Sequence, residues 1–208
     1  IKYIAEKKKP IILSTGMANE KEISEAVNVV KSFGSGDFML LHCVSGYPTP
    51  VDQINLNTIH LLKKTFNCDV GLSDHTLGNL SALQSISLGA KVIEKHFTLS
   101  RKDKGPDSEF SMEPKELKQL SKDIDLAFKS LGEASFKQKK SELPNMIFRR
   151  SIYVVKDLKK GAVLDKESVR RIRPGYGLAP KYYNEILGKK INKNIEKGTP
   201  LDWSLIDT

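Results

Sequence analysis

The sequence predicts an α/β protein with a parallel sheet, followed by a small domain rich in β-strands. In residues 1–132, four short apolar segments alternate with segments whose apolar residues recur at helical spacing. Such alternation is typical of strand–helix units that build a parallel sheet through right-handed crossovers. The apolar segments carry few polar residues, which indicates strands that are covered on both faces. From residue 147 onward, short β-type segments separated by turn residues replace this pattern.

The first strand is predicted at residues 10–14 and runs into a turn at Thr15 and Gly16. Asn19 then starts a helix, because Glu22 follows three residues later in the spacing of a capping box. Two prolines in the loop at 45–50 predict a fixed conformation rather than a helix start. The other strands are predicted at residues 38–44, 69–73 and 91–97. The other helices are predicted around residues 59–66, 79–88 and 114–131.

A change of pattern after Gly132 divides the chain into two domains. Residues 133–146 are charged and aperiodic, so we interpret them as a linker. Residues 147–208 are predicted to form the small β-rich domain, with strands near 150–155 and 169–173.

Composition is that of an ordinary globular protein, with 39% hydrophobic and 28% charged residues among 208. No apolar run reaches the length of a membrane helix or a secretory signal, so a cytoplasmic protein without membrane contact is expected. Cys43 and Cys68 are interpreted as reduced thiols in or near a core. The formal charge of +9 comes from lysines without interleaved aromatics, which favours an anionic small substrate over nucleic acid.

Two histidines stand where predicted strands give way to polar residues. His75 and His96 are separated by one strand–helix unit. Because parallel strands bring their carboxyl ends to one rim, the two imidazoles can converge on an ion such as Mn, Zn or Fe. The alternative is that each is a hydrogen-bonded structural residue. Asp74 is predicted either to cap a helix or to orient His75.

Hydroxyl and carboxyl groups follow the same strand ends. Hydroxyls and backbone N–H groups at such positions are natural phosphate ligands. The alternatives are that the two serines at strand ends cap the following helices and that Asp107 only shapes a turn. The candidates are Ser14, Ser45, Tyr47, Ser73 and Asp107.

Several sequence blocks together resemble the sialic acid synthase family. In the first domain these are STGM at 14–17, LHCVSGYPTP at 41–50, GLSDHTLG at 71–78, VIEKHFTL at 92–99 and GPDS at 105–108. In the second domain, IRPGYGL at 172–178 and LGKK at 187–190 are similar to that family's antifreeze-like (SAF) domain. The resemblance implies the C-terminal half of a (β/α) TIM-type barrel followed by a SAF domain.

The resemblance also implies an activity. Members of this family condense phosphoenolpyruvate with an N-acetylated amino sugar and release phosphate, using a divalent metal that is usually Mn²⁺, with Mg²⁺ or Co²⁺ also suited. It implies that His75 and His96 hold the metal and act in catalysis. It further implies that Ser14 and Ser73 contact phosphate, that Ser45, Tyr47 and Asp107 contact the sugar, and that Arg173 reaches the sugar's acyl group from the SAF domain of the partner in a domain-swapped homodimer.

The branch of the family is open to two interpretations. The blocks at 71–76, 105–111 and 173–181 look most like pseudaminic acid synthases, which use a diacetamido-trideoxy altrose. His42-Cys43 is closer to the sialic (N-acetylneuraminate) and legionaminate synthases.

The family's N-terminal barrel half, with its general-base glutamate and phosphate-binding lysines, has no counterpart in these residues. We therefore expect an open sheet edge and no activity from these 208 residues alone. The rival interpretation is a non-catalytic module that binds carbohydrate or anions.

Overall fold

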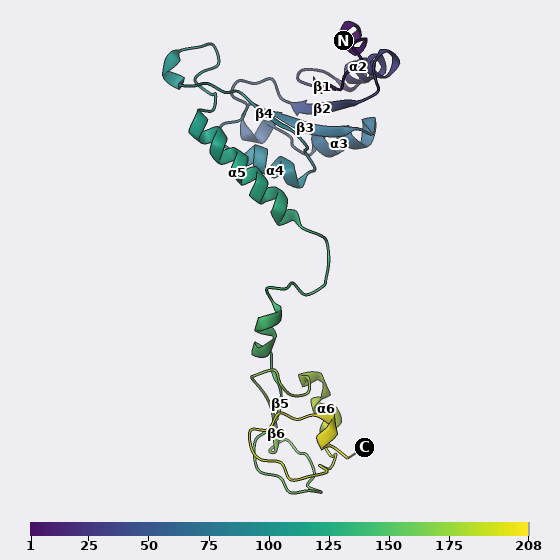
Figure 1. The fold of residues 1–208 in the computed structure, drawn as a ribbon, viewed down its shortest axis with the longest axis vertical. Coiled ribbons are helices and arrows are strands. Elements are labelled where there is room, and N and C mark those ends of the chain that lie inside the picture. The colour runs from purple at the N-terminus through teal and green to yellow at the C-terminus, as the bar shows by residue number, and fades with distance from the viewer. Residues whose placement is uncertain (208) are drawn as a thin grey trace. The chain divides into compact units, whose positions relative to one another are not determined.

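The computed structural model describes residues 1–207 and divides the chain into two compact units, Ile1–Glu133 (unit 1) and Ala134–Thr208 (unit 2). Figure 1 shows a sheet with its helices in unit 1 and a smaller set of strands in unit 2. Each unit is described by itself.

Unit 1 is built on a parallel sheet whose strands follow one another in chain order. The strands are β1 (Ile11–Ser14), β2 (Phe38–Cys43), β3 (Asp69–Asp74) and β4 (Ile93–Lys95). Each pairs in parallel with the next, in the order β1-β2-β3-β4. All four predicted strands are confirmed, although β4 is shorter than the expected 91–97. Neighbouring strands in sequence order form the wall of a (β/α) barrel, so this sheet corresponds to half of such a wall.

Helices alternate with these strands, as predicted. The predicted helices are α2 (Glu20–Phe33), α3 (Thr58–Phe66), α4 (Leu80–Ser87) and α5 (Pro114–Leu131), whereas the short α1 (Lys2–Ala5) before β1 was not predicted. The capping box at the start of α2 is confirmed, since Asn19 accepts from the Glu22 N–H at 3.0 Å and Glu22 accepts from the Asn19 N–H at 2.8 Å. Within residues 1–207, none of the helices combines the length and apolar character that crossing a membrane requires.

The two faces of the sheet have different roles. On one face Leu40 and Val70 pack with Ile59 and Leu62 of α3 in a buried apolar cluster. Side chains alternate along a strand, so the other face of the sheet carries Cys43, Ser73 and Glu94. In the strand register, Ser73 of β3 lies between Cys43 of β2 and Glu94 of β4. The polar residues of this second face line the carboxyl ends of the strands.

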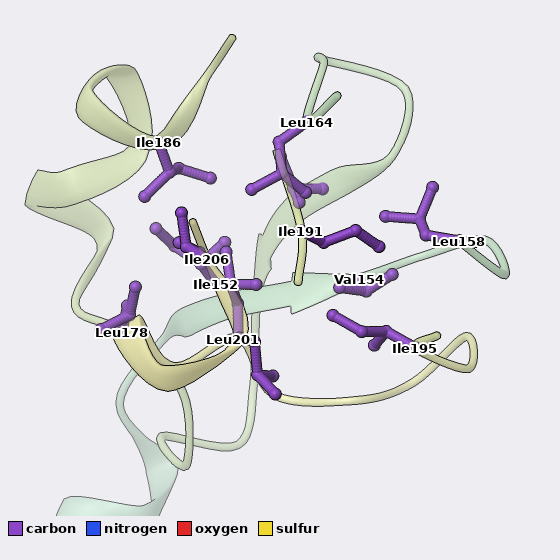
Figure 2. Close-up of a cluster of buried hydrophobic side chains, with 12 residues drawn as sticks. Ile152, Val154, Leu158, Leu164, Leu178, Ile186, Ile191, Ile195, Leu201 and Ile206 are labelled. Atoms are coloured by element: carbon purple, nitrogen blue, oxygen red, sulfur yellow. The ribbon is translucent and has the colours of Figure 1, made fainter. Parts of the chain in front are cut away.

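Unit 2 contains the predicted β-segments around a single apolar core. β5 (Ser151–Val154) pairs antiparallel with β6 (Val169–Ile172), and α6 (Tyr183–Ile186) follows. A 3₁₀ helix at Leu143–Phe148 occupies part of the segment expected as an aperiodic linker. Twelve buried aliphatic side chains form the core (Figure 2): Ile152, Val154, Leu158, Leu164, Val169, Leu178, Ile186, Ile191, Ile195, Leu201, Leu205 and Ile206.

Candidate active site

The carboxyl ends of β2, β3 and β4 bring the predicted rim residues of unit 1 together. The rings of His75 and His96 lie 5.0 Å apart, measured between their centroids. The two histidines follow neighbouring parallel strands, so their approach is a direct result of the sheet register. The structure thus produces the convergence that the sequence predicts.

His75 is held in one orientation by the loop after β2. It is only 7% exposed, and its Nδ1–H donates to the Val44 carbonyl at 2.9 Å. The same loop is tied to β3 because the Thr49 N–H donates to the His75 carbonyl at 3.0 Å. Thr49 Oγ1 also donates to the Val44 and Gly46 carbonyls, which fixes the loop as its two prolines predicted. With Nδ1 protonated, the Nε2 of His75 keeps its lone pair for a ligand.

His96 has a carboxylate beside it. Asp107 Oδ2 lies 3.5 Å from His96 Nδ1, on the loop that precedes α5. A carboxylate beside one ring nitrogen, with the other nitrogen available, is the usual arrangement around metal-binding histidines. The proximity of Asp107 to His96 keeps it among the candidate site residues.

Aromatic rings surround the histidine pair. The Tyr47 ring lies 4.4 Å from that of His75 and 5.7 Å from that of His96, between centroids. Phe110 lies 5.1 Å from His96 and 5.8 Å from Tyr47. Tyr47 is about half exposed, so its ring covers the imidazoles while part of the side chain faces solvent. The rings pack against both imidazoles, of which His75 is buried and His96 stays partly exposed.

Polar groups on the inner face of the sheet lie next to the histidines. The Ser73 hydroxyl donates to Glu94 Oε1 at 2.7 Å. Cys43 Sγ lies 3.9 Å from Ser45 Oγ and 4.0 Å from His75 Nδ1. Ser14 is exposed at the end of β1. Neither Ser14 nor Ser73 caps a helix, because α2 and α4 have their own N-cap asparagines, so that interpretation is wrong.

A glycine makes room for one of these hydroxyls. A Cβ atom at Gly16 would overlap Ser45 Oγ and would come within 3.0 Å of Cys43 Sγ. The turn after β1 can therefore approach the loop after β2 only because residue 16 has no side chain. This close approach brings the rim of β1 toward the rim of β2.

A buried ion pair supports the rim from the other face of the sheet. Lys95 Nζ lies 3.0 Å from Asp74 Oδ2, and the two side chains are 4% and 0% exposed. Lys95 also donates to the carbonyls of Thr76 at 2.8 Å and Gly78 at 3.1 Å. Asp74 immediately precedes His75, and Lys95 immediately precedes His96. The ion pair therefore fixes the spacing between the two backbone positions that carry the imidazoles.

This arrangement corrects the prediction for Asp74. Its carboxylate neither caps a helix nor contacts His75, since it accepts from Lys95 and from the Thr76 N–H at 2.8 Å. The group that orients His75 is the Val44 carbonyl. His42 does not face the rim either: it is buried, and its Nε2–H donates to the Ile54 carbonyl. Burial, opposed in part by this hydrogen bond, lowers the pKa of His42.

Sequence reasoning missed four residues that the site contains. Cys43, Glu94, Lys95 and Phe110 all contact or support the predicted residues. Alternation offered a signal for two of them, because Cys43 stands two positions before Ser45 and Glu94 two positions before His96. Arg173 belongs to unit 2, where it is exposed directly after β6.

The two histidines are the residues of unit 1 best placed to hold a metal. Across residues 1–207, no group of three or more His, Cys, Asp or Glu is arranged around one metal position. The donor set fits a divalent ion as two neutral imidazoles, with the remaining positions left to water or substrate oxygens. The site thus offers two imidazoles, the hydroxyls of Ser45 and Ser73 and the aromatic rings of Tyr47 and Phe110.

Comparison with known proteins agrees with both units. The NeuB family model matches residues 1–136, and the SAF domain model matches residues 149–207. A pseudaminic acid synthase from Campylobacter jejuni is 42% identical over 98% of this chain and 60% of its own length. An N,N'-diacetyllegionaminic acid synthase from the same species is 44% identical over 95% of this chain and 60% of its own length. The chain thus spans about 60% of the length of these curated relatives.

Solved structures support the same fold. An N-acetylneuraminic acid synthetase from Leptospira borgpetersenii, known from a crystal structure, has 37% sequence identity to this chain. Its structure matches with a TM-score of 0.64, over 70% of this chain and 50% of that one. The spore coat polysaccharide biosynthesis protein spsE from Bacillus subtilis is 28% identical, with a TM-score of 0.60 over 100% of this chain and 63% of that one. The prediction of half a (β/α) barrel followed by a SAF domain is confirmed. The chain belongs to the NeuB family and carries a SAF domain after its barrel-type unit.

Proposed function

We propose that the protein is a pseudaminic acid synthase, which condenses phosphoenolpyruvate with 2,4-diacetamido-2,4,6-trideoxy altrose and releases phosphate. The observation that carries this proposal is the His75–His96 pair, with one nitrogen of each ring left for a ligand, at the rim of a NeuB-family unit. Three relatives described as pseudaminic acid synthases are 42%, 41% and 39% identical to this chain. The choice of the altrose rests on the blocks at 71–76, 105–111 and 173–181, which look most like those of pseudaminic acid synthases.

In this proposal His75 and His96 hold a divalent ion, with Mn²⁺ as the first choice and Mg²⁺ or Co²⁺ as alternatives. When bound there, the ion supplies Lewis-acid polarisation of the sugar's open-chain aldehyde. The chain's own contribution is orientation: the Val44 carbonyl and Asp107 fix the two imidazoles. Tyr47 and Phe110 pack against these imidazoles and provide an apolar surface beside them.

The hydroxyls of Ser14 and Ser73 are proposed to bind the phosphate of phosphoenolpyruvate. Ser73 donates to Glu94, so its O–H points along the inner face of the sheet. Phosphate binding would exchange this hydrogen bond to a carboxylate for one to a phosphate oxygen, so that one charge-assisted hydrogen bond replaces another. The exposed Ser14 needs no such exchange.

The sugar is proposed to lie against Ser45, Tyr47 and Asp107, all within the loops around the two histidines. Arg173 is proposed to reach the sugar's acyl group from the SAF domain of a second subunit in a domain-swapped homodimer. Its exposure leaves the guanidinium available for such a contact. We place the reaction in the cytoplasm, where phosphoenolpyruvate is produced.

A legionaminate synthase is the second candidate. Two N,N'-diacetyllegionaminic acid synthases, from Campylobacter jejuni and Legionella pneumophila, are 44% and 40% identical to this chain. These values match those of the pseudaminic acid synthases. Overall identity therefore does not separate the two sugars, and the substrate has to be measured.

The test is phosphate release from phosphoenolpyruvate by the complete gene product with Mn²⁺. The altrose, the legionaminic acid precursor and N-acetylmannosamine are offered in parallel. Release with the altrose alone, abolished by a chelator, is the expected result. Release with the legionaminic precursor instead reassigns the branch. No release with any sugar, from a folded and complete protein, overturns the synthase proposal in favour of a binding module.

A further inference from the structure

The net positive charge of this protein comes entirely from unit 2. Unit 1 contains 17 basic and 17 acidic residues, whereas residues 134–208 contain 17 basic and 8 acidic residues. The formal net charge of +9 is therefore the net charge of the smaller unit. A charge this concentrated raises the local concentration of anions around that unit.

Part of this charge lines a hollow beside β6. The hollow has a volume of about 570 Å³, within the range typical of small-molecule sites. Its lining comes from the start of β5, the turn before β6, β6 itself and the segment around α6. The lining residues are Arg150, Lys166, Arg170, Arg171, Ile172, Pro180 and Tyr183. Four of these seven are cationic and none is acidic.

The carboxylates nearest in sequence are already engaged. Asp165 accepts from the Ser168 N–H at 2.7 Å and lies 3.8 Å from Lys156 Nζ. Glu167 Oε2 lies 3.7 Å from the same Lys156 nitrogen. Over residues 1–207, none of the four cations of the hollow forms an ion pair within 4.0 Å. The hollow therefore presents positive charge that the protein does not neutralise.

One guanidinium in the hollow is held in place. The Arg171 guanidinium carbon lies 4.4 Å from the centre of the Tyr183 ring. The Tyr183 hydroxyl donates to the Val169 carbonyl at 3.3 Å, so the ring that supports Arg171 is itself tied to β6. Stacking leaves the edge of the guanidinium free to donate two parallel hydrogen bonds. Less side-chain entropy is lost when such a group binds a ligand.

We propose that this hollow is a binding site for a small molecule that carries a phosphate group. Phosphate fits the arrangement because its two charges at neutral pH oppose several cations at once, and a fixed guanidinium binds two of its oxygens. A nucleic-acid track, which stacks successive bases on several rings, is disfavoured because, among residues 1–207, Tyr183 is the one aromatic residue lining this hollow and Arg171 lies over one of its faces.

The size of the hollow indicates a molecule larger than the bare ion. A second hollow of about 320 Å³ adjoins the first and shares Arg150 and Pro180 with it. It contains the exposed ring of Tyr176 together with Met146 and Ile147. A phosphate ester with an apolar or planar group can therefore extend from the cationic hollow onto Tyr176.

The experiment is calorimetric titration of the full chain, without metal or sugar, with inorganic phosphate, phosphoenolpyruvate and a nucleoside monophosphate. These three probes separate a reaction product, a substrate and a nucleotide as the source of the phosphate group. We expect saturable binding that weakens at least tenfold in an Arg170→Gln, Arg171→Gln double variant. Arg171→Lys keeps the charge without the planar fork, so it should weaken binding by less.

The matched control is a Lys159→Gln, Lys160→Gln double variant, which removes the same charge from exposed positions of unit 2 outside the hollow. It should leave affinity within twofold of the original. An equal loss in the control would show general charge attraction and overturn the proposal. NMR gives a second test. If added phosphate shifts other resonances but not those of the Arg171 side chain, phosphate binds elsewhere, for example at Ser14 and Ser73, and the proposal is overturned. Because these readouts need no turnover, they stand whether or not the synthase proposal survives.

Discussion

The two units of this chain place their polar groups differently. Of the thirteen buried polar or charged residues in the described part of the chain, eleven lie in unit 1, whereas Ser151 and Ser168 are the two in unit 2. Unit 2 instead buries twelve aliphatic side chains and carries its excess charge on the surface. Buried polar groups cost free energy unless they are hydrogen-bonded, so they are informative where they cluster. The comparison indicates that unit 1 fixes a site from within, while unit 2 is a stable scaffold that presents a surface.

The largest expected effect tests the rim of unit 1. His75→Ala or His96→Ala in the full-length protein should lower turnover at least ~10³-fold, or about 4 kcal/mol in the barrier, because the ion site loses one of two imidazoles. The matched control is His60→Ala, since His60 is exposed on α3 and should tolerate the change. Initial rates of phosphate release measure the effect. Near-normal turnover in either rim variant would remove the metal assignment.

The second prediction concerns the buried ion pair of unit 1. Lys95→Met leaves the Asp74 carboxylate buried without its cation, which should destabilise unit 1 by about 3–5 kcal/mol. Trp203 is the only tryptophan and lies in unit 2, so its fluorescence follows that unit during urea unfolding. Far-UV circular dichroism of the long helices α2 and α5 follows unit 1. Only the dichroism transition should move.

Two variants control this result. Lys91→Met, at an exposed position just before β4, should change stability by less than about 0.5 kcal/mol. Combining Lys95→Met with Asp74→Leu removes both charges and should recover much of the loss. A loss below about 1 kcal/mol for Lys95→Met alone would mean that the pair does not support the rim.

The third prediction applies the same readouts to unit 2. Ile152 is fully buried in its aliphatic core, so Ile152→Ala should cost about 2–5 kcal/mol through lost burial and a residual cavity. Here the Trp203 fluorescence transition should move and the dichroism transition of unit 1 should stay. If both transitions shift together, the two units unfold as one and the contrast between them does not extend to stability.

Much of this fold followed from the order of residues alone. Periodicity located all four strands of unit 1, and the Asn19–Glu22 spacing placed the start of α2. The approach of His75 and His96 was predictable because strand adjacency in a parallel sheet follows from chain order. These features depend on local patterns and on one topological rule.

What escaped prediction depends on contacts between distant residues. Lys95 looked like one more surface lysine, and only the paired register of β3 and β4 shows that its amine meets Asp74. Phe110 lies in a loop whose path has no periodicity, so its packing on His96 had no sequence signal. Cys43 was interpreted by composition as a core thiol, although strand alternation places it beside Ser45. The excess of basic residues in residues 134–208 was also visible in the sequence, but the net charge had been considered only for the whole chain.

A smaller effect is expected from the carboxylate beside His96. Asp107→Ala should weaken divalent-ion affinity about 10–100-fold, because the imidazole loses the group that orients it. Calorimetry with Mn²⁺ or Co²⁺ measures this without turnover. Asp103→Ala, an exposed acid in the same loop, is the control and should have no effect. Unchanged ion affinity with a raised sugar KM would instead assign Asp107 to the sugar alone.

The smallest predicted effect is a pH dependence that only unit 1 should show. Burial lowers the pKa of His42, so the folded state favours its neutral form. The stabilisation is complete above the unfolded value near 6.5 and is lost as the pH falls toward the lowered pKa, by at most about 1.4 kcal/mol per pH unit. His42→Gln keeps a side-chain donor toward the Ile54 carbonyl but cannot titrate, so unit 1 should lose less stability than the original protein between pH 7.5 and 5.

All four histidines lie in unit 1, so the Trp203 transition should lack this histidine dependence altogether. His60→Gln is the matched control, because it makes the same substitution at an exposed position on α3, outside the sheet. The difference between the two variants isolates the contribution of the buried His42 ring. If His42→Gln retains the full pH dependence, titration of the buried imidazole does not contribute to it, and His42 stabilises the sheet through packing and its hydrogen bond alone.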